Sequence, residues 1–207
     1  MVSAPVVLPD LGGFSSAVSC VESGGVLAFP TETVYGIGVD PFNDDAIQRV
    51  FDIKGRDVAS ALPILVSSPE QLSRVVSGVT PNGLKLMERF WPGPLTLVLP
   101  AHPELPSALT GGLPTIAVRQ SSSATAAALV DHLEGPLTAT SANRSGQPPC
   151  TSAHEVEDAL GNDIDLILDG GPTTTLTPST LVDVTGPAIE VLRPGPLTET
   201  AILAALY

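Results

Sequence analysis

Short apolar segments alternate with helix-like segments along most of this chain, and this alternation restricts its fold more than any other feature. The apolar runs have the length of buried strands, and the segments between them carry apolar residues at helical spacing. Strands are expected at 26–29, 62–66, 95–99, 115–119, 137–140, 166–168, 180–184 and 189–192. Helices are expected at 15–23, 43–54, from 68, 80–90, 152–160 and 199–206. Interleaved strands and helices predict an α/β domain built around a mixed sheet.

The starts of several helices are marked by capping residues. Asn43 precedes two acids, which favours an N-cap followed by a negatively charged first turn. Segments 68–71 and 152–155 both read as capping boxes, with serine first and glutamine or glutamate three residues later.

The chain has 207 residues and shows no internal repeat or long linker, so we expect one domain over residues 1–207. Hydrophobic residues make up 43% and aromatic residues only 4%, which predicts an aliphatic core. No apolar run approaches the roughly 20 residues of a membrane helix, and the first residues do not resemble a signal peptide. Cys20 and Cys150 lie far apart, which argues against a disulfide scaffold or a zinc site. We therefore expect a cytoplasmic protein with no membrane partner.

The formal net charge is −13, with 9 Lys and Arg residues against 22 Asp and Glu residues. Proteins that hold nucleic acid by its phosphates need a basic face, because the release of counterions drives that binding. We therefore expect weak or no direct binding of tRNA.

The few cations fall into two groups. Those inside predicted helices are expected to be solvated or ion-paired: Arg49, Arg74, Lys85 and Arg89. The others lie at the ends of elements or in turns: Lys54, Arg56, Arg119, Arg144 and Arg193. Because ligands of α/β proteins gather at strand ends, the second group indicates an anion-binding site. For Lys54 and Arg56, interaction with the C-terminus of a helix is an equal alternative.

Two polar clusters could belong to the same site. Segment 138–146 (TATSANRSG) leaves a strand through hydroxyl and amide residues, as a phosphate or ribose site would, although these residues also suit an ordinary turn. Segment 29–38 (FPTETVYGIG) combines hydroxyls, one acid and two glycines, which permit close approach to a ligand. Its acid, Glu32, is either a base or, as the commoner case, an exposed turn carboxylate.

Familiar catalytic motifs are absent from the sequence. It contains no GxxxxGK[ST] loop, no GxGxxG after a strand and no GxSxG elbow. The three histidines show no metal-ligand spacing. If ATP binds, it therefore binds without a P-loop.

Taken together, the clusters resemble the YrdC-like threonylcarbamoyl-AMP synthase family in its short, single-domain form. The resemblance spans about 25–197 and rests on segments in matching order: PTETVYGIG (30–38), KGR (54–56), FWPGPLTLVLP (90–100), TIAVR (115–119), TSANRSG (140–146), STLVD (179–183) and LRPG (192–195). It implies a single-domain fold with a twisted, open mixed sheet, flanking helices and a large concave cleft.

The resemblance also implies roles for individual residues. Those implied to bind ATP are Lys54, Arg56, Thr115, Ser141, Asn143 and Arg193, of which Lys54 and Arg56 would be catalytic. Those implied to bind L-threonine are Thr31, Thr33, Tyr35, Arg119 and Ser179. Mg²⁺ is implied to be held through the ATP phosphates, with no metal ligands from the protein.

The implied activity is the synthesis of threonylcarbamoyl-AMP from L-threonine, bicarbonate and ATP, for the modification of tRNAs that read ANN codons. The implied partner is a downstream tRNA threonylcarbamoyl transferase complex. Two alternatives stay open: a related carbamoyl-adenylate enzyme with another substrate, and a non-catalytic RNA-binding or ribosome-maturation factor, which the acidic charge disfavours.

Overall fold

The computed structural model describes residues 3–55, 61–173, 175 and 177–207. Within these residues the helices are α1 Leu11–Glu22, α2 Asp44–Lys54, α3 Pro69–Val75, α4 Pro81–Phe90, α5 Ser107–Thr110, α6 Ala124–His132, α7 Ala153–Leu160 and α8 Glu199–Ala204. The strands are β1 Val6–Val7, β2 Leu27–Pro30, β3 Tyr35–Gly38, β4 Ile64–Leu65, β5 Leu95–Pro100, β6 Thr115–Arg119, β7 Leu137–Thr138, β8 Thr140–Ser141, β9 Leu166–Leu168, β10 Thr180–Asp183 and β11 Glu190–Arg193.

The strands form two mixed sheets. The first sheet has the order β1-β9-β2-β3-β8, and the second has the order β11-β10-β5-β6-β4-β7. Both contain parallel and antiparallel neighbours: β2 runs parallel to β9 and antiparallel to β3, and β5 runs parallel to β10 and antiparallel to β6. The predicted mixed α/β class is confirmed, but the strands form two sheets and not the single sheet expected from the sequence.

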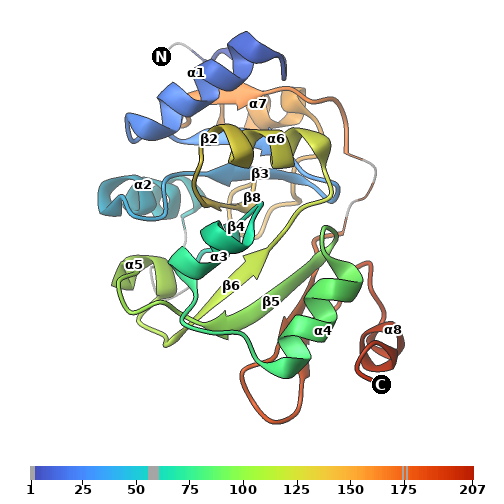
Figure 1. Ribbon diagram of the computed structural model, residues 1–207. Coiled ribbons are helices and arrows are strands. Elements are labelled where there is room, and N and C mark those ends of the chain that lie inside the picture. Colours follow the sequence, from blue (N-terminus) through green and yellow to red (C-terminus); the bar gives the residue numbers. More distant parts are fainter. Residues whose placement is uncertain (1–2, 56–60, 174, 176) are drawn as a thin grey trace.

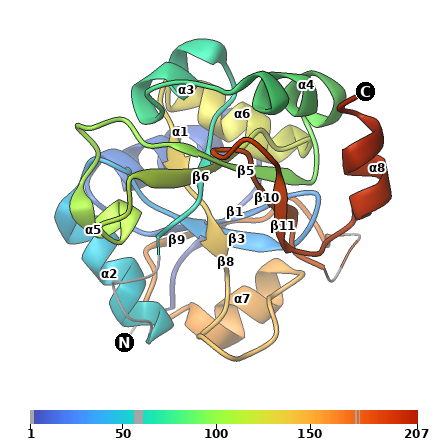
Figure 2. The same ribbon diagram turned by 90° about the horizontal axis from the view of Figure 1, so that it is seen from below.

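The helices cover the sheets on different sides. Figure 1 shows α1, α6 and α7 beside the first sheet, and α4 and α8 beside the second. Both views place α4 next to α8, and the Lys85 ammonium on α4 donates to the Leu206 carbonyl just after α8 (Figures 1 and 2). Among the described residues, no helix combines the length and the apolarity that crossing a membrane requires.

The expected strand at 137–140 is in fact two strands in different sheets. β7 pairs with β4 in the second sheet and β8 pairs with β3 in the first, so the chain passes between the sheets at Ala139. There β3 runs very close to β7: a Cβ on Gly38 would lie 2.2 Å from the Thr138 carbonyl oxygen. Only glycine fits at this crossing.

The predicted helix caps are observed. The side chains of Asn43, Ser68 and Ser152 accept hydrogen bonds from the backbone N–H groups of Ala46, Gln71 and Glu155. The helix α2 ends at Gly55, whose φ of 59° is left-handed. Helices α5 and α6 and strand β3 were not expected, because α6 is an alanine-rich segment with little contrast between its faces and β3 contains two glycines.

Side chains on the strands of the second sheet alternate between two faces, one packed in the core and the other facing a cavity. On β5, Leu95, Leu97 and Leu99 are fully buried in the larger core cluster. The residues between them, Thr96 and Val98, face the other way, because successive side chains of a strand point to opposite faces. The next strands follow the same pattern, and their outward residues form the floor of a cavity.

Candidate functional site

A cavity of about 540 Å³ lies between the two sheets. Its size is that of a small-molecule site. Every predicted site residue that the structure describes lines it: Thr31, Thr33, Tyr35, Lys54, Thr115, Arg119, Ser141, Asn143, Ser179 and Arg193. Arg56, the remaining predicted residue, lies outside the described residues. Residues far apart in the sequence thus meet in one hollow.

Lys54 holds one wall of the cavity together. Its side chain is buried, and its Nζ donates to Ser141 O at 2.6 Å, to Asn143 O at 2.9 Å and to Asn143 Oδ1 at 3.2 Å. The Ser141 hydroxyl also donates to Asn143 Oδ1 at 2.6 Å. Lys54 is the last residue of α2, and its ammonium contacts the serine–asparagine segment at the end of β8.

The floor of the cavity is polar at one end and apolar in the middle. Thr96 and Arg119 lie on neighbouring strands β5 and β6, and Val98 pairs with Ala117 two residues further along. Beyond this apolar pair lies Thr115 at the start of β6. A ligand along β6 would therefore meet Arg119 at one end, an uncharged surface next, and a hydroxyl after that.

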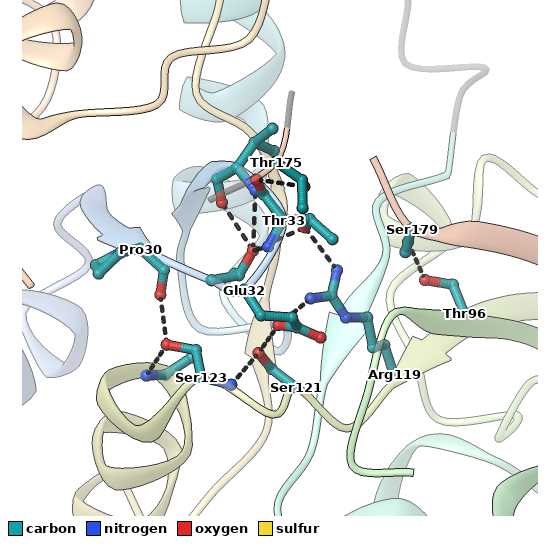
Figure 3. Close-up of polar contacts among 12 residues, drawn as sticks. Pro30, Glu32, Thr33, Thr96, Arg119, Ser121, Ser123, Thr175 and Ser179 are labelled. Atoms are coloured by element: carbon teal, nitrogen blue, oxygen red, sulfur yellow. Dashed lines mark hydrogen bonds and ion pairs between the residues drawn. The ribbon is translucent and has the colours of Figure 1, made fainter. Parts of the chain in front are cut away.

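Arg119 occupies the polar end in a network shown in Figure 3. Its Nη1 donates to Thr33 Oγ1 at 3.2 Å, and its Nη2 forms an ion pair with the Glu32 carboxylate, which also accepts from the Ser121 hydroxyl. The Arg119 residue is only 7% exposed, and burial lowers the pKa of its guanidinium, against the opposing effect of the Glu32 charge. For Glu32, burial alone would raise the pKa, but the Arg119 charge and the Ser121 hydrogen bond outweigh it, so the pKa lies below its usual value.

This network corrects one expectation. Glu32 is not an exposed turn carboxylate, since its side chain is 18% exposed and forms an ion pair with a residue of the other sheet. The sequence could not indicate this pairing, because Arg119 lies 87 positions further along the chain, and only the packing of the two sheets brings the charges together.

A second polar network lies next to Arg119 and involves Thr96 of the neighbouring strand β5 (Figure 3). Thr96 Oγ1 and Ser179 Oγ share a hydrogen bond of 2.6 Å (Figure 3). The Arg193 guanidinium donates to Ser179 O through Nη2 at 3.0 Å and to Ser179 Oγ at 3.3 Å. Thr96 was not among the predicted residues, although its place as a buried hydroxyl between leucines of a strand was a signal that could have found it.

The loop between β2 and β3 supplies hydroxyl groups to the cavity. Thr31 Oγ1 lies 2.9 Å from Thr33 Oγ1 and donates to Val34 O at 2.7 Å. Thr175 Oγ1 donates to the Thr33 carbonyl at 3.1 Å. Tyr35 lines the cavity, but its hydroxyl lies 2.8 Å from Gly171 O and 3.2 Å from Asp169 Oδ1, so its polar end is engaged beside β9.

Arg144 does not belong to the cavity lining, in contrast to the sequence grouping of cations at turns. Its guanidinium forms an ion pair with Asp163 at 2.7 Å and donates to the Ile53 carbonyl at 3.0 Å. Arg144 therefore joins the turn after β8 to the segment before β9. A position at a turn gave the same signal for this structural cation as for the cations that line the cavity.

The family model Sua5/YciO/YrdC, described as telomere recombination, matches residues 19–195. The chain belongs to this family. The resemblance inferred from the motifs is confirmed, and so is the α/β class of fold.

Members of the Sua5/YciO/YrdC family with curated names are similar over most of this chain. A threonylcarbamoyl-AMP synthase of Pyrococcus abyssi is 42% identical over 181 residues, which cover 87% of this chain and 53% of that protein. A threonylcarbamoyl-AMP synthase of Coxiella burnetii is 39% identical over 166 residues, which cover 79% of this chain and 89% of that protein. The chain thus spans about half the length of the Pyrococcus relative and most of the Coxiella relative.

Solved structures of the family have the same fold. Pyrococcus abyssi Sua5 in complex with L-threonine superimposes with a TM-score of 0.94 at 38% identity, covering 98% of this chain and 61% of that chain. Escherichia coli YciO superimposes with a TM-score of 0.87 at 26% identity, covering 98% of this chain and all of that one.

Proposed function

We propose that this chain is an L-threonylcarbamoyladenylate synthase. It would form threonylcarbamoyl-AMP and pyrophosphate from L-threonine, bicarbonate or CO₂, and ATP. The names of its relatives and the threonine bound to Pyrococcus Sua5 support this proposal.

One observation carries the proposal: scarce cations and a serine–asparagine turn line a single cavity in a chain of net charge −13. Lys54, Ser141 and Asn143 would receive the phosphates, with Thr115 and Arg193 completing the ATP site. Thr31, Thr33, Tyr35, Arg119 and Ser179 would surround threonine at the polar end of the floor. A cationic residue that faces a cavity in so acidic a protein is best explained by an anionic ligand.

The proposed reaction has two steps. The neutral threonine amine attacks bicarbonate or CO₂, forming a C–N bond and N-carboxythreonine. Water is released when bicarbonate is used, and a proton passes to solvent when CO₂ is used. The new carboxylate then attacks the α-phosphorus of ATP, and the bond to the β-phosphate oxygen breaks to release pyrophosphate. The protein's contribution is to hold both substrates in line and to offset phosphate charge.

The described lining residues do not form a magnesium cage. They offer one carboxylate, Asp183, whose Oδ1 already accepts hydrogen bonds from the Thr185 backbone and hydroxyl. No group of three or more His, Cys, Asp or Glu side chains able to hold a metal occurs in the described part of the chain. We propose that Mg²⁺ enters with ATP, whose phosphate oxygens are ligands that this ion prefers.

The product would serve threonylcarbamoyladenosine formation in tRNAs that read ANN codons. A tRNA threonylcarbamoyl transferase complex would take the adenylate from this protein in the cytoplasm. The strong negative charge favours an arrangement in which the transferase, and not this chain, binds the tRNA.

The direct test incubates the pure protein with ATP, Mg²⁺, L-threonine and bicarbonate and detects the adenylate by mass spectrometry. Pyrophosphate release is measured in parallel across a panel of amino acids and carbamoyl phosphate. We expect a product that requires both threonine and bicarbonate. Pyrophosphate release with carbamoyl phosphate or another amino acid, and none with threonine, would assign the cavity to a related adenylate-forming reaction. Salt-dependent tRNA binding without any pyrophosphate release would contradict an enzymatic function.

A further inference from the structure

The Arg119 guanidinium presents only part of its hydrogen-bonding capacity to the cavity. Its Nε and Nη2 are sealed from solvent and have no hydrogen-bond partner of good geometry, and the same is true of Glu32 Oε1 opposite them. Arg119 nevertheless lines the cavity. Nη1 is therefore the guanidinium nitrogen left to face a ligand, and it lies 3.2 Å from Thr33 Oγ1.

The Glu32 carboxylate is the group that closes the other edge. It forms the ion pair with Arg119 Nη2, and Figure 3 shows it on the far side of the guanidinium from Thr33. Glu32 itself does not line the cavity. An arginine has five N–H donors in a planar fork, so a carboxylate along one edge determines which donors remain for a substrate.

The segment that leads into α6 contacts the Glu32 carboxylate through Ser121. The Ser121 hydroxyl donates to Glu32 Oε2 and accepts from Ser123 N at 3.2 Å. The Ser123 hydroxyl caps α6 and also lies 3.4 Å from the Pro30 carbonyl, which it can reach as a donor. The carboxylate is therefore fixed between the loop after β2 and the strand end of β6, in a region with little room to move.

We propose that Glu32 is a positioning residue for the amino-acid substrate, an inference that rests on the proposed function. Glu32 pairs with Nη2 of Arg119 and leaves Nη1, beside Thr33 Oγ1, to meet the substrate carboxylate. It also neutralises the buried guanidinium, so this end of the cavity accepts a small zwitterion with one carboxylate and holds a triphosphate less well. Without Glu32, Arg119 would be free to rotate and would carry an uncompensated charge.

The competing interpretation is that the ion pair between Arg119 and Glu32 only stabilises the packing of the two sheets. Loss of such a pair would lower stability and affect both substrates alike. Loss of a positioning residue would act on threonine far more than on ATP, because Lys54, Ser141 and Asn143 lie on a separate wall. The ratio of the two KM values therefore distinguishes the interpretations.

The test compares Glu32→Gln, which keeps the shape and removes the charge, with Glu32→Asp, which keeps the charge on a shorter side chain. The control is Asp165→Asn, which weakens the ion pair between Arg49 and Asp165 outside the cavity, where both side chains are 43% exposed. KM for threonine, KM for ATP and kcat are measured for each purified protein. Stabilisation of each protein by L-threonine in a thermal unfolding assay is recorded without ATP, so that binding is followed independently of turnover.

We expect Glu32→Gln to raise KM for threonine about 10- to 100-fold, the effect of one charge-assisted contact, with KM for ATP changed less than about 3-fold. Glu32→Asp should fall between Glu32→Gln and the wild type, and Asp165→Asn should keep both KM values. A threonine KM within about 2-fold of wild type in Glu32→Gln, or equal rises for both substrates, would overturn the proposal.

The proposed function can fail separately. A wild-type protein that threonine stabilises, but that forms no adenylate, would contradict the function, and the thermal assay would still test Glu32. A wild-type protein that neither binds nor uses threonine would overturn both proposals.

Discussion

Replacing Lys54 with methionine would test the cation that joins the end of α2 to the serine–asparagine turn. The substitution keeps a long unbranched side chain and removes the ammonium, which donates hydrogen bonds to Ser141 O, Asn143 O and Asn143 Oδ1. The turn after β8 would then lose the group that joins it to the end of α2.

The size of the effect follows from opposing contributions. Three hydrogen bonds from a charged group contribute roughly 1.5–3 kcal/mol each to the free energy of unfolding, while desolvation of the buried ammonium costs several kcal/mol. The net loss of stability for Lys54→Met is therefore about 2–4 kcal/mol. For a chain of this length, each kcal/mol lowers Tm by about 2–4 °C, so we expect a decrease of about 5–15 °C.

Urea unfolding and thermal unfolding followed by circular dichroism would measure this loss, and pyrophosphate release would measure catalysis. Catalysis should fall by more than about 100-fold, because the loss of positive charge behind the turn and the disorder of Ser141 and Asn143 both weaken the phosphate site. Lys85→Met, at an exposed lysine of α4 that does not line the cavity, removes an exposed hydrogen bond to the Leu206 carbonyl, so it should change stability by less than about 1 kcal/mol and keep full activity. If Lys54→Met kept both wild-type stability and wild-type rates, the structural role and the phosphate role of Lys54 would be refuted together.

Two further predictions concern stability. Gly38→Ala should lower the free energy of unfolding in urea by about 3 kcal/mol, because the new Cβ would lie 2.2 Å from the Thr138 carbonyl oxygen. Gly78→Ala, whose Cβ would meet open space, should change it by less than about 1 kcal/mol. Equal effects of the two substitutions would contradict the close crossing of β3 and β7. The pKa of Glu32 is lowered from 4.5 in the folded protein, so its contribution to stability is present above about pH 4.5 and is lost as pH falls through the folded value. The difference in unfolding free energy between wild type and Glu32→Gln should therefore shrink between about pH 5 and pH 3, and a constant difference over that range would refute a charged Glu32.

Local sequence signals determined the elements and many residues of the site. The starts of three helices could be predicted from Asn43, Ser68 and Ser152, because an N-cap depends on a side chain and a backbone group only three residues apart. The short apolar run at 95–99 predicted β5, because the length of such a run is also a local feature of the sequence. Ser179 was found through the resemblance, since it carries no local signal of a shared site, whereas Arg119 was already indicated by its position at a strand end.

Tertiary packing decided which of those residues act together. Residues 137–140 were predicted as one strand, yet they contribute to two sheets, because β4 pairs with the first half of this extended segment and β3 with the second. Arg144 and Arg193 look alike as cations at turns, but only Arg193 lines the cavity, and Arg144 is bound by Asp163. Glu32 acquires its role from Arg119 on the opposite sheet. Backbone periodicity and capping act over a few residues and can be read from the sequence, whereas ion pairs and cavities depend on distances that exist only once the two sheets have packed together.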